Sequence, residues 1–280
     1  MAQNKTRQKT APKRKPTAKS GKKRTASKSR TGSFKYNKVT AFVAIIAVIS
    51  IISGIIVYHN EDRVAAPTFF STDATQLAGI DVSQHNGKID WNKVKDEADF
   101  AFIRVGYRGY GDGKIYKDKK AKTNLKNANK NNVPVGVYFY SQAINEKEAE
   151  KEAKYLIDVV KDYDIDLPLV IDFEYAMKNG KHTGRLHNAG LSNKERTRLV
   201  NAFCKKVKDA GYTPGIYAST YVYETQFNVK DLDKDAVIWV ADYNKNITYS
   251  GDFDIWQYSE YGTCSGINSN DVDLNYWYLS

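Results

Sequence analysis

The chain has 280 residues, enough for one large α/β domain or two small ones, and its formal net charge is +11. The first 38 residues hold 14 of the 43 Lys and Arg residues and no Asp or Glu, so 29 basic residues face 32 acidic ones in the remainder. The basic balance therefore belongs to the N-terminal tail, and we expect no nucleic acid as a partner of the main domain. Two Cys residues are too few for a disulfide-dense scaffold or a Cys-rich zinc site.

An uncharged apolar segment follows the tail at residues 39–58. As a helix it spans about 30 Å, the thickness of a bilayer core. The 14 positive charges precede it, so we predict a disordered cytoplasmic tail at 1–38 and a single-pass transmembrane helix at 39–58. A linker at 59–77 and a domain at 78–280 are then expected outside the cytoplasm. A signal peptide cleaved near Val64–Ala66 is the open alternative, although its segments would be long for one.

Short apolar runs recur from residue 78 onward, and they give eight candidate strands at 78–82, 100–106, 134–141, 168–174, 213–218, 236–242, 253–258 and 272–278. Helical patterns separate the earlier runs at 91–98, 118–131, 146–163 and 193–210. Strands that alternate with helices favour parallel pairing, so we predict an α/β fold, either a barrel or a doubly wound sheet. Eight strands fit a small barrel. The late connections at 244–252 and 259–271 are too short for crossover helices, so the last strands are expected to pair partly antiparallel.

Acidic residues stand at the C-terminal ends of these strands, where barrels carry their chemistry. They are Asp81, Asp172, Glu174 and Asp273. Asp172 and Glu174 alternate along one strand, so their side chains face the same side, roughly 6.6 Å apart along the chain. Burying adjacent carboxylates costs several kcal/mol and does not arise for packing. Two such groups in unlike environments can divide into a proton donor and an ionised stabiliser, as glycoside cleavage requires.

Other chemistries compete with this interpretation. Strand ends that merely meet solvent would also carry acidic residues, and carboxylate clusters bind Mg²⁺ or Mn²⁺. The four His residues show no HExxH spacing, and we expect neither a metal nor another cofactor. No GxSxG elbow is present, which argues against a Ser nucleophile. Cys204 is expected in the core, and its pairing with Cys264 stays open.

Aromatic side chains in or just after strands are expected to divide between barrel packing and stacking on sugar rings. The candidates for substrate binding are Tyr138, Tyr140, Tyr217, Trp239, Tyr243 and Trp256. Arg104, Gln257 and Asn275 are candidate polar contacts.

Eight segments of the chain together resemble glycoside hydrolase family 25, the muramidases also called Chalaropsis-type lysozymes. The segments are GIDVSQHNGKIDW at 79–91, FIRVGYRGYGDG at 102–113, GVYFYSQA at 136–143, PLVIDFEY at 168–175, AGYTPGIYAS at 210–219, IWVADY at 238–243, DIWQYS at 254–259 and DVDLN at 271–275. The resemblance implies an irregular (β/α)5β3 TIM-like barrel. It also implies hydrolysis of the β-1,4 bond between N-acetylmuramic acid and N-acetylglucosamine in peptidoglycan glycan strands.

The resemblance also implies roles for the acidic residues. Glu174 matches the acid/base, Asp172 matches the carboxylate that steadies the reacting N-acetyl group, and Asp81 and Asp273 match two further carboxylates of the floor. One departure is visible, because a Lys-x-Ser/Thr-Glu stretch of many relatives reads Arg104-Val105-Gly106-Tyr107 here. The expected mechanism is substrate-assisted with retention, while inversion through an activated water stays open. An inactive peptidoglycan-binding module and a membrane-bound scaffold are the alternative functions.

Overall fold

The computed structural model describes residues 74–279, so the predicted tail, the apolar segment at 39–58 and nearly all of the linker lie outside the described residues. No helix within 74–279 combines the length and the apolar character that a membrane span needs. The predicted division of the chain before residue 74 therefore stays a prediction.

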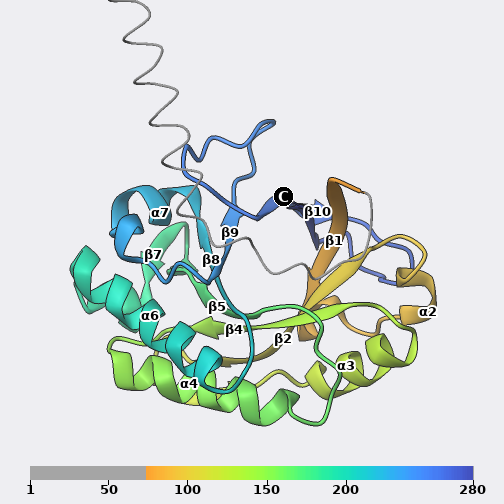
Figure 1. Cartoon of the computed structure of the whole chain (residues 1–280), viewed down its shortest axis with the longest axis horizontal. Helices are drawn as coiled ribbons and strands as arrows, with labels where there is room; N and C mark the ends of the chain where they lie inside the picture. Colours follow the sequence, from red (N-terminus) through yellow and green to blue (C-terminus); the bar gives the residue numbers. More distant parts are fainter. Residues whose placement is uncertain (1–73, 280) are drawn as a thin grey trace, which may run out of the picture. The chain divides into compact units, whose positions relative to one another are not determined.

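Eight strands close into a barrel (Figure 1). They are β1 (Gln76–Val82), β2 (Phe100–Arg108), β4 (Val135–Ser141), β5 (Leu169–Phe173), β8 (Pro214–Ser219), β9 (Val237–Ala241), β10 (Ile255–Gly262) and β11 (Val272–Tyr278). They pair in this order, and β1 closes the barrel by pairing with both β2 and β11. The first seven run parallel, whereas β11 is antiparallel to β10 and β1. The predicted eight-stranded barrel and its partly antiparallel end are confirmed.

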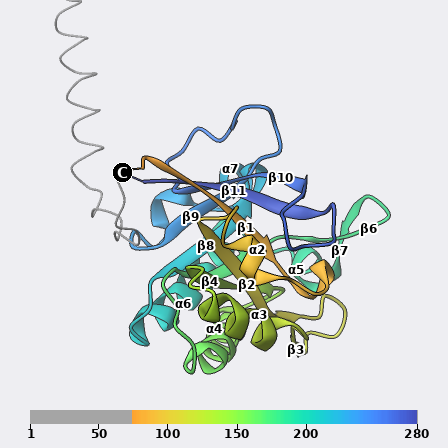
Figure 2. The same cartoon turned by 90° about the vertical axis from the view of Figure 1, so that its right-hand side faces the viewer.

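Each of the first five barrel strands is followed by a helix. These helices are α2 (Trp91–Val94), α3 (Ala121–Lys130), α4 (Glu146–Val160), α6 (Asn193–Asp209) and α7 (Thr220–Gln226). Smaller elements lie between them: η1 (Gln84–Asn86), β3 (Ile115–Lys117), β6 (Ala176–Lys178), β7 (Lys181–Thr183), α5 (Gly184–Asn188) and η2 (Val229–Asp231). Figure 2 shows α3, α4 and α6 on the side of the barrel opposite β10 and β11.

Local sequence signals explain where the long helices begin and end. The Asn145 side chain accepts the Glu148 N–H at the start of α4, and Ser192 forms a capping box with Glu195 at the start of α6. After α6 ends, Gly211 takes a positive φ of 85°, which glycine adopts at little cost. The apolar faces of both helices are buried against the barrel.

Three of the predicted helices are shorter than their patterns suggested, and α4 ends at Val160 instead of residue 163. The helix predicted at 118–131 is present as α3, but α3 starts at Ala121 rather than at residue 118. The reason is that the buried Asp118 carboxylate accepts hydrogen bonds from the Gln84 and Lys120 N–H groups and from Arg104 Nε. α2 ends at Val94 instead of residue 98, where the chain continues in hydrogen-bonded turns toward β2.

Aromatic rings fill the interior of the barrel below its C-terminal end. The ring of Phe102 packs against Trp239 with centroids 4.6 Å apart, and that of Phe100 packs edge-on against Trp277 at 5.5 Å. Glycine at position 79 makes room for Phe100, because a Cβ there would collide with the ring. A second apolar layer lies between the strands and the helices and includes Cys204, whose thiol is free, as is that of Cys264.

Candidate active site

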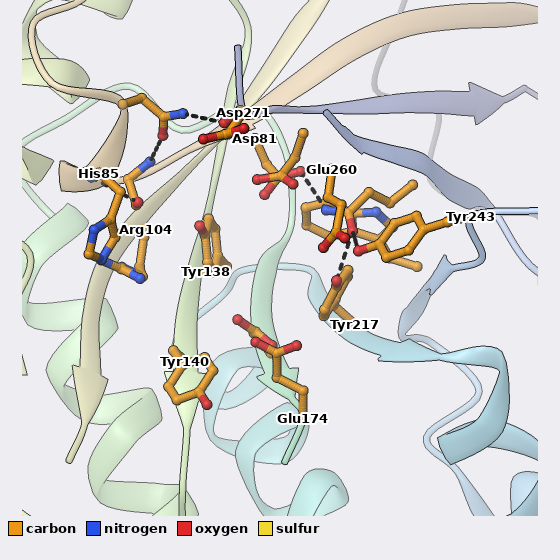
Figure 3. Close-up of a pocket in the computed structure, with 16 residues that line it drawn as sticks. Asp81, His85, Arg104, Tyr138, Tyr140, Glu174, Tyr217, Tyr243, Glu260 and Asp271 are labelled. Atoms are coloured by element: carbon orange, nitrogen blue, oxygen red, sulfur yellow. Dashed lines mark hydrogen bonds between the residues drawn. The ribbon is translucent and has the colours of Figure 1, made fainter. Parts of the chain in front are cut away.

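A pocket of about 290 Å³ opens at the C-terminal ends of the parallel strands. The side chains labelled in Figure 3 converge on it from strands and adjoining segments far apart in the sequence. Eleven of the thirteen residues predicted for catalysis and binding line this pocket: Asp81, Asp172, Glu174, Asp273, Arg104, Tyr138, Tyr140, Tyr217, Trp239, Tyr243 and Gln257. The position of acidic residues at strand ends was therefore a good guide to where side chains meet.

Trp256, like Asn275, is a predicted binding residue that does not line the pocket. It precedes Gln257 on β10, and neighbouring residues of a strand face opposite sides. Its Nε1 donates to the Asp242 carbonyl at 2.6 Å. Its ring packs with those of Tyr258 and Tyr276 at 5.8 and 6.3 Å, so this cluster lies on the other face of the sheet.

We expect Tyr243→Ala to lower kcat/KM on glycan oligomers by up to ~10-fold, because loss of ring contacts of this kind is worth about 0.5–1.5 kcal/mol. Tyr243 is half exposed and lines the pocket. Trp256→Phe, which keeps a ring in the outer cluster, is expected to leave kcat/KM unchanged. Steady-state kinetics of both variants measure this, and the reverse order would place the sugar platform on the outer face.

Asp81 is held rigidly at the floor of the pocket. Its Oδ2 accepts hydrogen bonds from Gln257 Nε2 at 2.8 Å and from Asn275 Nδ2 at 2.9 Å. Both donors are buried, so the orientation of the carboxyl is fixed before any substrate arrives. Asn275, a predicted polar contact, acts on Asp81 rather than on the pocket surface.

Aromatic side chains orient these two amides in turn. The hydroxyls of Tyr217 and Tyr243 both donate to Gln257 Oε1, at 2.8 and 2.6 Å. Trp239 Nε1 donates to Asn275 Oδ1 at 2.8 Å. Three of the predicted aromatic residues therefore belong to the hydrogen-bond network of the site as well as to its walls.

Asp172 presents an oxygen without a partner. The residue lies near the end of β5 and is buried, and its Oδ1 makes no hydrogen bond within the described part of the chain. Glu174 lies just beyond the end of β5 and lines the same pocket. Because buried polar atoms are nearly always paired, the free acceptor on Asp172 is suited to a donor from a bound molecule.

The pocket raises the pKa of all four carboxyl groups, chiefly through burial. The pKa is about 6 for Asp81, about 7 for Glu174 and about 9 for Asp273, where the charges of the neighbouring carboxylates add to the burial. Burial and the charges of Glu174 and Asp81 also raise the pKa of Asp172 well above its usual range, although Arg104 opposes this. Both groups are buried among like charges, so both pKa values are raised, and the division into an ionised Asp172 and a protonated Glu174 stays a prediction.

These raised pKa values predict a stability that falls as pH rises. An Asp in the unfolded chain ionises near pH 4, whereas Asp273 keeps its proton in the folded state until about pH 9. Its favourable contribution is therefore full below pH 4 and is lost as pH rises toward 9. Asp273→Asn is expected to have a higher Tm relative to wild type at pH 9 than at pH 5. Thermal unfolding at both pH values tests this, and a constant difference in Tm would contradict it.

Arg104 brings a positive charge to the wall of this acidic pocket. Its Nε donates to Asp118 Oδ2 at 3.0 Å, and its guanidinium lies over the Tyr107 ring, 5.5 Å from the centroid. Tyr107, at which the sequence departs from the pattern expected from the resemblance, stacks on Tyr116. The departure from the family pattern thus supplies an aromatic support for the arginine.

Sequence reasoning missed five residues that line the pocket: Ser83, His85, Asn86, Glu260 and Asp271. Regular alternation from Gln257 would turn Glu260 away from the pocket. The pairing of β10 with β11 shifts register between Gln257 and Ser259 and again between Ser259 and Gly262. Such bulges re-aim side chains, and Glu260 consequently adds a negative charge that raises the pKa of Glu174. Gly262 was the one available sequence signal for this irregularity.

The sequence itself decides the family. Residues 80–267 match the family described as "Glycosyl hydrolases family 25". The chain belongs to glycosyl hydrolase family 25. The predicted resemblance and its barrel are confirmed by this match and by the fold.

Relatives within this family include proteins named as lysozymes. The chain is 25% identical over 204 residues to the autolytic lysozyme of Clostridium acetobutylicum, covering 71% of this chain and 55% of that protein. It is 27% identical to Lysozyme M1 of Streptomyces globisporus, covering 74% and 70%. The solved structure of the modular autolysin LytC from Streptococcus pneumoniae, in complex with a synthetic peptidoglycan ligand, is 30% identical with a TM-score of 0.62. That match covers 75% of this chain and 48% of LytC, so the chain spans about half the length of such modular relatives.

Proposed function

We propose that this chain is a peptidoglycan hydrolase that cleaves the β-1,4 bond between N-acetylmuramic acid and N-acetylglucosamine. The observation that carries the proposal is the pair at the end of β5. Glu174, with a pKa of about 7, can hold a proton for a leaving group, and Asp172 beside it offers a free buried acceptor. Membership of glycosyl hydrolase family 25 and the lysozyme relatives support this assignment.

The proposed reaction is substrate-assisted. Glu174 donates its proton to the glycosidic oxygen as the bond to the anomeric carbon breaks, and the substrate's 2-acetamido oxygen attacks that carbon. The acetamido N–H donates to Asp172 Oδ1, and the positive charge developing on the amide favours the ionised form of Asp172. Glu174 then accepts a proton from the water that opens the oxazolinium ion, which gives net retention.

Mass spectrometry of muropeptides released by the purified chain tests the proposed bond. We expect N-acetylmuramic acid at the new reducing ends, and N-acetylglucosamine there would contradict the assignment. Nuclear magnetic resonance of the first product anomer tests retention, because inversion would give the opposite anomer first. A peptidoglycan-binding module without activity would bind walls and release no reducing ends.

The proposal extends to location. The uncharged segment at 39–58, preceded by 14 positive charges, supports a single membrane span with the catalytic domain outside the cytoplasm. Protease added to intact cells should then digest the domain and spare the first 38 residues. Digestion of the tail first would reverse this orientation, and a mature chain that starts near Ala66 would replace the anchor with a cleaved signal.

A further inference from the structure

A fully buried glutamine lies behind Glu174. Gln142 directly follows the last residue of β4, and its Nε2 donates to the Glu174 carbonyl and to the Ser141 carbonyl, each at 2.9 Å. Turning the amide over would place its oxygen against both carbonyl oxygens, so the observed orientation is the one these contacts allow. In that orientation Gln142 Oε1 is buried and has no partner within residues 74–279.

The hydrogen bond from Gln142 to the Glu174 carbonyl lies where the pairing of β4 with β5 ends. The pairing of β4 with β5 ends at Ser141 and Phe173, so Gln142 is the position opposite Glu174 where the next pair would be. The main chain of Glu174 is thus beyond the ladder that holds the rest of β5. The Gln142 side chain supplies a donor to its carbonyl at the first position that the ladder leaves open.

A charged clamp holds Gln142 itself. Arg185 on α5 donates from Nη1 to the Gln142 carbonyl at 2.7 Å. The same guanidinium binds Glu148 on α4 with two bonds, Nη1 to Oε2 at 2.6 Å and Nη2 to Oε1 at 2.9 Å. Two-bond pairing fixes the plane of an arginine, so the main chain at Gln142 is tied to α4 and α5 together.

The residue before Gln142 is tied to α4 by a second ion pair. Ser141 Oγ donates to Glu152 Oε2 at 2.6 Å, and Arg108 Nε donates to Glu152 Oε1 at 2.6 Å. Arg108 Nη2 also donates to the Glu148 carbonyl at 3.0 Å, which joins the two ion pairs. Gln142 is therefore held rigidly, and its Nε2 binds the main-chain carbonyl of Glu174 through one hydrogen bond.

We propose that Gln142 is a positioning residue for Glu174, holding its main chain so that the carboxyl reaches the glycosidic oxygen. This inference rests on the proposed function, in which Glu174 is the proton donor. An aliphatic side chain would fill the same space without leaving an orphan acceptor. The glutamine forgoes one hydrogen bond at Oε1 and in return fixes the residue that carries the proton.

Gln142→Met tests the proposal, because methionine keeps the length of the side chain and removes the donor. We expect kcat to fall ~10- to 100-fold, since a misplacement of about 1 Å can cost 10²-fold. KM should change little, because Gln142 does not line the pocket. Asn124→Leu on α3 is the matched control: it also removes a buried amide with one unpartnered polar atom, which is the nitrogen in Asn124, and it is expected to leave kcat unchanged.

A double-mutant cycle with Glu174→Gln separates positioning from general damage. If Gln142 acts through the Glu174 carboxyl, Gln142→Met should cost nothing further in the Glu174→Gln background. Losses that multiply, or a loss that falls on KM, would overturn the inference. Arg185→Lys, which keeps the charge and loses the two-bond geometry, is a second variant should Gln142→Met not fold. Arg185→Lys is expected to lower kcat less than Gln142→Met does, and this loss should be absent in the Glu174→Gln background. Full activity of Glu174→Gln by itself would instead reject the proposed function.

Discussion

Glu174→Gln is expected to lower the rate of peptidoglycan cleavage by about 10²- to 10⁴-fold, the contribution that a positioned general acid supplies. Glutamine matches the size of glutamate and keeps the main-chain oxygen that Gln142 binds, so the fold should be retained. What is lost is the proton that the raised pKa of about 7 keeps on Glu174 near neutral pH. The release of reducing ends from purified walls measures the rate, and thermal unfolding measures the fold.

Glu260→Gln is the control for this experiment. Glu260 lines the same pocket and influences Glu174 through its charge. Removing that charge is expected to lower the pKa of Glu174. The alkaline limb of the pH–rate profile then moves to lower pH, and most activity is retained on the acidic side. Wild-type activity in Glu174→Gln would show that another group donates the proton.

Asp172→Asn is expected to lower turnover as strongly, for a different reason. The free Oδ1 of Asp172 is proposed to receive the acetamido N–H and to offset the charge of the cyclic intermediate. An activated leaving group needs less protonation, but ring closure still needs that charge. Glu174→Gln should therefore be partly rescued on an aryl chitooligosaccharide that wild type hydrolyses, whereas Asp172→Asn should not.

The measurement is a pair of rates for each variant, on natural glycan and on the aryl substrate. Rescue of Asp172→Asn together with an unrescued Glu174→Gln would exchange the two roles and reject the mechanism. Rescue of neither variant would show that proton transfer is not the step that Glu174 assists.

The strands and the pocket were predictable because both depend on local pattern and on barrel geometry. Apolar runs place the strands, and the ends of parallel strands meet at one face, so Asp81 and Asp172 come together from positions distant in the sequence. The face of the strand on which a given side chain lies was harder to predict. Trp256 was predicted for the pocket but faces the other way, whereas Glu260 reaches it through two register shifts.

Elements that depend on tertiary contacts gave little signal. The short helix α7 and the β6–β7 hairpin lie in stretches where no apolar period is long enough to recognise. Gln142 looked like one polar residue after a strand. Its role depends on the point where the pairing of β4 with β5 stops, which is a property of two strands and not of either sequence alone.

The antiparallel seam between β1 and β11 has a geometric consequence for access to long polymers. Gln76 pairs with Tyr278 at one end of the seam, and Asp81 pairs with Asp273 at the other, where the pocket opens. Five residues of strand separate the two ends, which is roughly 17 Å. Residue 76 therefore lies at the end of the seam away from the pocket, so a long polymer can approach the mouth of the pocket without meeting the N-terminal end of β1.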